Sequence, residues 1–377
     1  MPAWLVVEKG PRAEGGGRRW ALPVALLLGA SSCAKTVAPA ESPAEQPPAD
    51  ERSLTPPAAS GVEVRAPAPQ TARRFEPLCS RSEPWCVELE KPSALQGEVQ
   101  LPTDQAVLVD LLRARRMLES GPLAFGEGGD EARKALLVLE EAQGKAAPPS
   151  IVSRLELESA RAHLALGRSD LALPSLVDLA ARYDGEPEVW GALGVALLAE
   201  GKLVRSLEPL ARAARLQPNE PERHLVLGTA RFLSGDYAQA EGSFRRALSL
   251  DGDLARAHGD LGALLLVVGR LQEGRQHLQR ASLLRPKKAT YLSNLAYAEL
   301  LLARPEKAIR LAERATQMEP DLASAWLNLG LAQVAEGKRG LARASFERAQ
   351  SLDPTDPRPR NNLADLEELE AQPLPEQ

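Results

Sequence analysis

The chain has few of the residues on which most catalytic and metal sites depend. Its 377 residues include four histidines and three cysteines. No histidine belongs to an HExxH motif or to a Cys/His cluster of the kind that holds zinc. The sequence contains no GxSxG motif, and its carboxylates are scattered over helical positions that face solvent, with no isolated acid–base pair. We therefore predict a protein that is not an enzyme and that needs no cofactor and no metal.

Aromatic side chains and an excess of positive charge are also scarce. Aromatic residues make up 4% of the chain and hydrophobic residues 44%, a composition expected of a core built from leucine and alanine. The formal net charge is -5 at pH 7, and the pI is about 5.7. This balance argues against non-specific binding of nucleic acid. Charges of both signs are mixed along the predicted helices, which indicates solvated faces.

From Ser153 to Pro354 the sequence repeats with a period of 34 residues. In each unit a large residue stands three positions before a leucine, and a small residue follows that leucine. The large residues are Trp190, His224, His258, Leu292 and Trp326, and the small ones are Gly194, Gly228, Gly262, Ala296 and Gly330. Packing therefore explains His224 and His258, whereas His163 and His277 stand alone on their predicted helices.

Small residues recur on both predicted helices of a unit. Those of the second helix include an unbroken column of Ala213, Ala247, Ala281, Ala315 and Ala349. Small residues let two helix backbones approach closely, and the large apolar residues fill the space beside them. The first helix is predicted to end in a left-handed residue at Gly201, Gly235, Gly269 and Gly337.

The order of a large residue, Leu-Gly, a small residue, an aromatic residue, Ala and Pro resembles the tetratricopeptide repeat (TPR) family. The resemblance implies an all-α fold, a superhelical solenoid of helical hairpins that stack on one another. It implies six units, at 153-186, 187-220, 221-254, 255-288, 289-322 and 323-356. A capping helix at 357-371 follows, with leucines against the last unit and acidic residues toward water.

In this family the first helix of each unit lines a concave surface, and its ninth, twelfth and thirteenth positions form a groove. In this chain the predicted groove residues are Val195, Leu198, Thr229, Phe232, Leu233, Ala263, Leu266, Val267, Tyr297, Leu300, Leu301, Leu331 and Val334. TPR proteins that clamp acidic C-terminal peptides carry Asn and basic residues there, so a carboxylate clamp is excluded. The apolar groove either binds an apolar helix or segment of a protein partner or is covered by the chain itself.

The N-terminus has the pattern of an export signal. Arg18 and Arg19 precede an apolar run of 11 residues from Trp20, too short for the roughly 20 that cross a bilayer. The run ends at Ala-Ser-Ser-Cys, which resembles a bacterial lipobox and implies lipidation of Cys33. We expect 1-33 to be a signal peptide with lipobox, with outer-membrane placement facing the periplasm. A plain cleaved signal or a short buried helix are the alternatives.

The region between Cys33 and the repeats has three predicted parts. The Pro/Ala-rich stretch 34-74 is expected to be a disordered tether. In the short segment 75-102, Cys79 and Cys86 are expected to form a disulfide if the chain is exported, and a metal or redox pair is the alternative. Apolar residues at helical spacing over Thr103–Ser120 and Asp130–Gln143 predict a hairpin within 103-152, either a degenerate repeat or an N-terminal cap.

These patterns predict a non-enzymatic scaffold for protein–protein interaction, anchored in the bacterial envelope and assembling a multiprotein complex through an apolar groove. The combination of signal, lipobox and about six repeats resembles the pilotin lipoproteins of type IV pili, although the cysteine pair and the tether depart from that pattern. The alternative is a soluble TPR adaptor or chaperone-like regulator, periplasmic or cytoplasmic. The expected partner is a protein or peptide, with membrane contact through the lipid alone and no nucleic acid.

Overall fold

The computed structural model describes residues 73–75, 103–120, 129–145, 147 and 149–371. These residues form α-helices joined by short turns, with no strand among them, which confirms the predicted all-α fold. None of the helices in the described part is long and apolar enough to span a bilayer. The signal segment with Cys33, nearly all of the tether, and the pair Cys79 and Cys86 lie outside the described residues.

The chain divides into two compact units. The N-terminal unit contains α2 (Thr103–Ser120), α3 (Gly129–Gln143), α4 (Pro149–Ala165), α5 (Ser169–Arg182) and α6 (Pro187–Ala199). The C-terminal unit begins at Leu203 with α7 (Leu203–Leu216). The division therefore falls inside the predicted repeat 187-220, whose first helix belongs to one unit and whose second helix belongs to the other.

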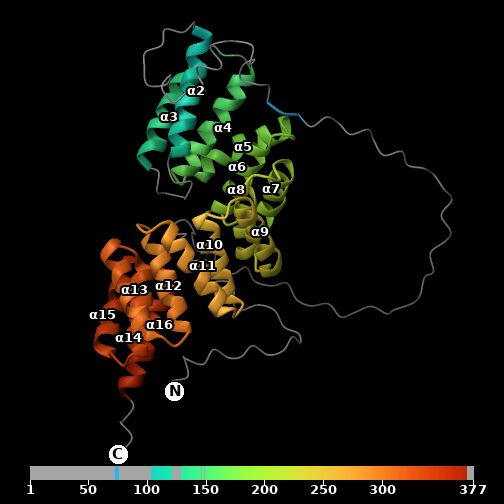
Figure 1. Ribbon diagram of the computed structural model, residues 1–377. Helices are drawn as coiled ribbons and strands as arrows, with labels where there is room; N and C mark the ends of the chain where they lie inside the picture. The colour runs from blue at the N-terminus through green and yellow to red at the C-terminus, as the bar shows by residue number, and fades with distance from the viewer. Residues whose placement is uncertain (1–72, 76–102, 121–128, 146, 148, 372–377) are drawn as a thin grey trace, which may run out of the picture. The chain divides into compact units, whose positions relative to one another are not determined.

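The N-terminal unit is a stack of antiparallel helices. α2 pairs with α3, α3 packs on α4, and α5 packs on both α4 and α6 (Figure 1). Leu111, Leu139 and Leu155 join α2, α3 and α4 in one apolar cluster. A second cluster joins Leu157 of α4, Leu176 of α5 and neighbouring residues of α6. The predicted N-terminal hairpin thus continues directly into the repeat stack.

The C-terminal unit continues with hairpins in the 34-residue period. Its first helices are α8 (Pro221–Leu233), α10 (Ala255–Val267), α12 (Ala289–Leu301) and α14 (Ala323–Ala335). The second helices are α9 (Tyr237–Leu250), α11 (Leu271–Leu284), α13 (Pro305–Met318) and α15 (Arg339–Leu352). Each first helix packs on its own second helix, and each second helix packs on the next first helix. α16 (Pro357–Ala371) covers α15 and buries Leu366, as a cap requires.

The turn between the two helices of a repeat is left-handed, as predicted. Gly201, Gly235, Gly269 and Gly337 have φ angles of 70°, 82°, 80° and 76°. Gly167, one period before Gly201, has a φ angle of 72°, and the one member of this column that is not glycine is Ala303, which takes the same conformation with φ 57°. An L-residue with a Cβ is strained there, by about 1–2 kcal/mol.

Replacing Ala303 with glycine should therefore raise the free energy of unfolding by about 0.5–1 kcal/mol, after subtraction of the extra flexibility of glycine in the unfolded chain. The matched control is Gly337→Ala, since an added Cβ at Gly337 would contact no atom within 4 Å and only the backbone strain would change. Chemical denaturation should show opposite shifts for the two variants. Equal shifts in the same direction would contradict this explanation.

Candidate binding surface on the first helices

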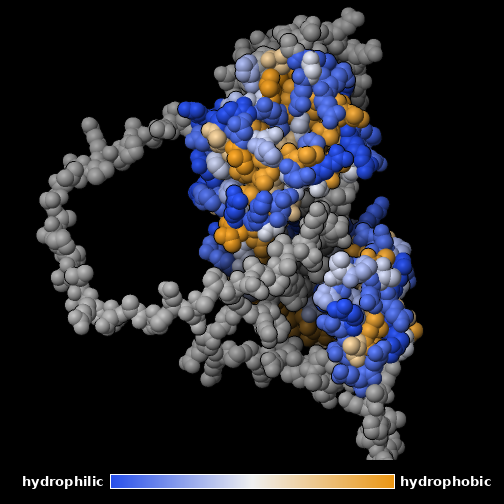
Figure 2. Space-filling view, turned by 180° about the vertical axis from the view of Figure 1, so that it is seen from behind, coloured by the Kyte–Doolittle hydropathy of each residue, from blue (hydrophilic) through white to orange (hydrophobic). Residues whose placement is uncertain are grey.

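Within each unit the first helices of successive repeats lie side by side. In the C-terminal unit α8 contacts α10, α10 contacts α12, and α12 contacts α14; in the N-terminal unit α2 contacts α4 and α4 contacts α6. Each unit therefore presents a face made only of first helices, on which the predicted groove positions lie. On the coloured surface drawn in Figure 2, hydrophobic residues form separate patches bordered by hydrophilic ones.

The predicted groove residues differ in burial. Phe232, Ala263 and Leu266 are buried. Phe232 packs against Tyr237, and Leu266 lies over Gly274 of α11, so both belong to the interior of their own hairpins. The remaining groove residues are half-buried: Val195, Leu198, Thr229, Leu233, Val267, Tyr297, Leu300, Leu301, Leu331 and Val334. Exposed apolar surface on this face thus comes mainly from the ninth and thirteenth positions.

A row of buried polar residues accompanies the apolar ones, and the sequence analysis did not identify it. Asp260, Asn294 and Asn328 occupy the same position of α10, α12 and α14. Asn328 Nδ2 donates to the backbone oxygen of Ser293 at 3.1 Å and to its Oγ at 3.0 Å, which ties α14 to α12. Oδ1 of Asn294 is buried and has no hydrogen-bond partner among the described residues. The signal was a polar residue at the same position of three successive units, directly before the leucine column.

The seam between α8 and α10 holds a buried acidic group. Oγ1 of Thr229 donates to Oδ2 of Asp260 at 3.1 Å, and Nε of Arg256 lies 4.0 Å from the same oxygen. Burial raises the pKa of Asp260, and Arg256 and Thr229 offset only part of this shift. Burial likewise raises the pKa of the nearby Glu222, although Arg256 opposes it. The seam therefore carries two carboxyl groups that resist ionisation beside one arginine.

Asp260→Asn should raise the free energy of unfolding at pH 7 by about 1 kcal/mol, because it removes a poorly compensated buried charge. A raised pKa means that the folded protein is destabilised above that pKa and regains stability as the pH falls through it. The gain from Asp260→Asn should therefore shrink on acidification and vanish below the ordinary pKa of an aspartate. Urea titrations at a series of pH values from 7 down to about 3 measure this. Asp253→Asn, at an exposed carboxylate paired with Arg280, is the control and should have little effect.

The corresponding face of the N-terminal unit is more highly charged. Nη2 of Arg115 on α2 lies 2.9 Å from Oε1 of Glu188 on α6. Between them, on α4, Glu158 is 2% exposed and pairs with Arg161 at 3.0 Å. Burial raises the pKa of Glu158, and the charges of Arg161 and Arg115 oppose this. A small cavity between these helices is lined by Arg115, Arg154, Glu158 and Glu188 together with leucines of α2 and α4.

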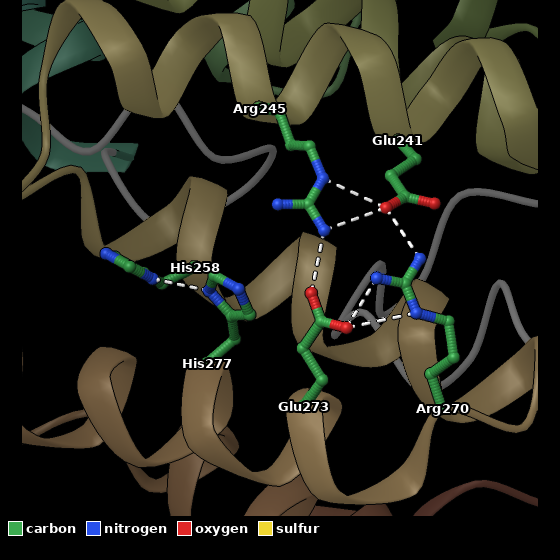
Figure 3. A network of polar contacts seen from close by, with 6 residues as sticks. All are labelled: Glu241, Arg245, His258, Arg270, Glu273 and His277. Carbon is green, nitrogen blue, oxygen red and sulfur yellow. Dashed lines mark hydrogen bonds and ion pairs between the residues drawn. The ribbon is translucent and has the colours of Figure 1, made fainter.

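A further polar network joins successive hairpins of the C-terminal unit (Figure 3). Arg245 contacts Glu241 at 2.9 Å and Glu273 at 2.7 Å, and Arg270 pairs with the same two carboxylates. The hydrogen bonds from Arg245 and Arg270 lower the pKa of Glu273 despite some desolvation. The charges alternate and satisfy one another, so this network links α9 to α11 and leaves no group poised for acid–base chemistry.

The structure also brings together two histidines that the sequence analysis had interpreted separately. Nδ1 of His258 lies 2.9 Å from Nδ1 of His277, and Nε2 of His258 lies 3.1 Å from the backbone oxygen of Gly252. Burial, followed by the charge of His258, lowers the pKa of His277. Within the described part of the chain, no group of three or more His, Cys, Asp or Glu residues is arranged to hold a metal ion.

Comparison with known proteins agrees with the helical pattern. Two tetratricopeptide repeat models match, one over residues 157–221 and 293–357 and the other over residues 231–296. No curated protein matches this sequence.

Solved structures show the same fold at low identity. A chain of the APC/C hetero-tetramer Cut9-Hcn1 matches with a TM-score of 0.60 and 17% identity, over 68% of this chain and 49% of that chain. This chain thus spans about half the length of that relative. A tetratricopeptide repeat protein from Parabacteroides merdae matches with a TM-score of 0.53 and 15% identity, over 70% of this chain and 99% of that one.

Pseudomonas aeruginosa pilF matches with a TM-score of 0.42 and 21% identity, over 48% of this chain and 88% of that chain, a similarity too low to bear on function. The 34-residue columns, the packed hairpins and the family models lead to one assignment. The chain belongs to the tetratricopeptide repeat family.

Proposed function

We propose that this protein is a lipid-anchored docking scaffold of the bacterial envelope, which holds a protein partner on the first-helix face of its C-terminal unit. Tetratricopeptide repeats act as scaffolds for protein–protein interaction. The observation that carries the proposal is the composition of that face. Half-buried apolar side chains at the ninth and thirteenth positions lie on the same first helices as the buried row of Asp260, Asn294 and Asn328.

Such a face suits a partner that buries apolar side chains against it, because apolar contacts supply most of the affinity. Asp260 and Asn328 bond to the neighbouring first helix, so the buried row fixes the spacing of the helices that form the face. Three predicted groove residues are already buried in their hairpins, so the proposed contacts are Leu233, Tyr297 and Leu301 with their half-buried neighbours. A partner helix or extended segment with an apolar face fits this arrangement.

The partner surface is tested by comparing charge substitutions on two faces. Leu233→Asp together with Leu301→Asp places carboxylates on the first-helix face, and Leu283→Asp places one on α11, where Leu283 is already 66% exposed. We expect affinity purification with the first variant to lose the bound partner and purification with the second to retain it. Retention in both would reject this face as the docking surface.

The anchor is tested by following palmitate incorporation in a bacterial host for the wild type and for Cys33→Ser. The basic residues and the short apolar run before Cys33 support lipidation there. We expect labelling and membrane association in the wild type and neither in the variant. Absence of label in both proteins would favour the second candidate, a soluble adaptor or chaperone-like regulator with the same binding face.

A further inference from the structure

A short piece of chain before the repeats is bound to the N-terminal unit far from its place in the sequence. Arg73–Phe75, blue in Figure 1, lies beside the turn from Tyr183 to Glu186 that joins α5 to α6. Backbone N of Arg73 donates to Oδ1 of Asp184 at 2.8 Å, and backbone N of Gly185 donates to the oxygen of Arg73 at 2.8 Å. Backbone N of Phe75 donates to Oε2 of Glu186 at 3.1 Å. All three hydrogen bonds thus use the main chain of the segment Arg73–Phe75.

The side chain of Phe75 enters an aromatic pocket. It is 7% exposed and lies edge-on to Tyr183, with 4.5 Å between the ring centroids. Cζ of Arg154 lies 4.9 Å from the centre of the phenyl ring. Phe75 belongs to the same apolar cluster as Leu157, Leu179 and Val189. An aromatic ring between a second ring and a guanidinium group gains both apolar burial and electrostatic attraction.

The repeat helices themselves hold the site in shape. The hydroxyl of Tyr183 lies 2.9 Å from Oγ of Ser153 on α4, which fixes the ring. Nε1 of Trp190 donates to the backbone oxygen of Asp184 at 2.9 Å, which fixes the turn. Asp184 and Glu186 also complement the positive charge of the segment, in which Arg73 and Arg74 precede the aromatic residue. These two contacts are made by residues of the repeats alone and do not involve Arg73–Phe75.

From these contacts we infer that the Tyr183–Glu186 turn and Arg154 form a docking site for an extended segment with basic residues before an aromatic one. This chain fills the site itself with Arg73–Phe75. The covalent connection keeps the local concentration of the segment high, so the site is occupied in the free protein. The segment that leads to the N-terminus is therefore fixed to the repeats at the α5–α6 turn, and a free segment of the same pattern competes for the site.

Hydrogen–deuterium exchange at the backbone amide of Gly185 in the full chain tests the occupied state. In the wild type this amide is bonded to Arg73, and we expect it to be protected. Phe75→Ala should make it exchange at least about tenfold faster, while the Asp251 amide, bonded to the oxygen of Ala247 at the end of α9 in the other unit, is the unchanged reference. Equal rates at Gly185 in the two proteins would overturn the inference.

Addition of a synthetic peptide of residues 70–78 tests the docking site in trans. We expect the peptide to restore protection of Gly185 in the Phe75→Ala protein, and the same peptide with alanine in place of phenylalanine to have no effect. Failure of the phenylalanine peptide would show that the contact belongs to the fold of one chain and would overturn the docking site.

Arg73→Pro covers the case in which Phe75→Ala does not fold. It removes the N–H that donates to Asp184 at an exposed residue and leaves the pocket intact. We expect intermediate acceleration at Gly185 with unchanged helicity. None of these readouts depends on Cys33 or on the face of the C-terminal unit, so they succeed or fail independently of the proposed function.

Discussion

Gly228→Ala should lower the free energy of unfolding by about 2 kcal/mol, and this loss should disappear when Phe244 is also shortened to alanine. A Cβ added to Gly228 on α8 would lie 2.6 Å from Cε1 of Phe244 on α9. Phe244 is completely buried, so its ring cannot swing aside without disturbing the hairpin. Phe244→Ala alone leaves a cavity and should cost about 3–5 kcal/mol.

In the double variant the new methyl group occupies part of the cavity that the phenyl ring left. We expect the two changes to be coupled by at least about 2 kcal/mol, measured as a double-mutant cycle in urea unfolding. The chain already contains a pair like the one in the double variant. Ala296 and Ala312 occupy the positions of Gly228 and Phe244 in the repeat 289-322, and both are buried. Gly242→Ala, where an added Cβ meets no atom within 4 Å, is the control and should be neutral or slightly stabilising. Additive costs would contradict the proposed contact.

The packing of a small residue on the first helix against a large residue on the second explains why so much of the fold could be predicted from the sequence. A glycine opposite a large residue, or an alanine opposite an alanine, recurs at a fixed period because each hairpin must close at nearly the same spacing. The left-handed turn was predicted at four glycines for a similar reason. Ala303 was missed because alanine does not favour that conformation, although its place in the period indicated it.

Other features leave no periodic trace. The columns continue across Lys202, so the sequence could not show that the chain divides there into two compact units. The sequence analysis assigned Phe75 to the short segment 75-102 that contains the cysteine pair. The structure places Phe75 in the core of the N-terminal unit, through contacts to residues 111 positions away. A contact at such a distance follows from no local pattern.

The candidate surface was predictable in outline but not in detail. Periodicity identifies the residues on the first helices, but it does not separate a side chain that closes its own hairpin from one that faces outward. Phe232 and Leu266 are of the first kind, and Leu233 and Tyr297 are only half-buried. The polar row that includes Asp260 was present in the sequence as a column. The sequence did not show that Asp260, which lies near Arg256, joins α10 to α8, because this depends on its contact with Thr229.

A second large loss of stability is expected where Gly262 of α10 faces Gly274 of α11. A Cβ added to Gly274 would lie 2.9 Å from the carbonyl oxygen of Gly262, and one added to Gly262 would lie 3.0 Å from that of Gly274. These obstacles are backbone atoms, so only a shift of a whole helix could relieve the clash. The equivalent positions Ala240, Ala308 and Ala342 tolerate a methyl group in their own hairpins, which indicates that the spacing of this hairpin is set by its two glycines.

Gly274→Val should therefore lower the free energy of unfolding by about 3 kcal/mol or more, because it adds a branched side chain against fixed backbone. Gly340→Val on α15 makes the same substitution where an added Cβ meets no atom within 4 Å, so it reports the change in helix propensity alone, a gain in stability of about 0.5 kcal/mol or less.

The position of Gly274 makes a second readout possible. α11 packs on both α10 and α12, and in a stack of repeats each hairpin depends on its neighbours. Weakening the middle of the stack should therefore separate the unfolding of α8 and α9 from that of α12 to α16, and denaturant unfolding should broaden or split for Gly274→Val but not for Gly340→Val. A single transition of unchanged midpoint would mean that α10 and α11 do not meet at these glycines.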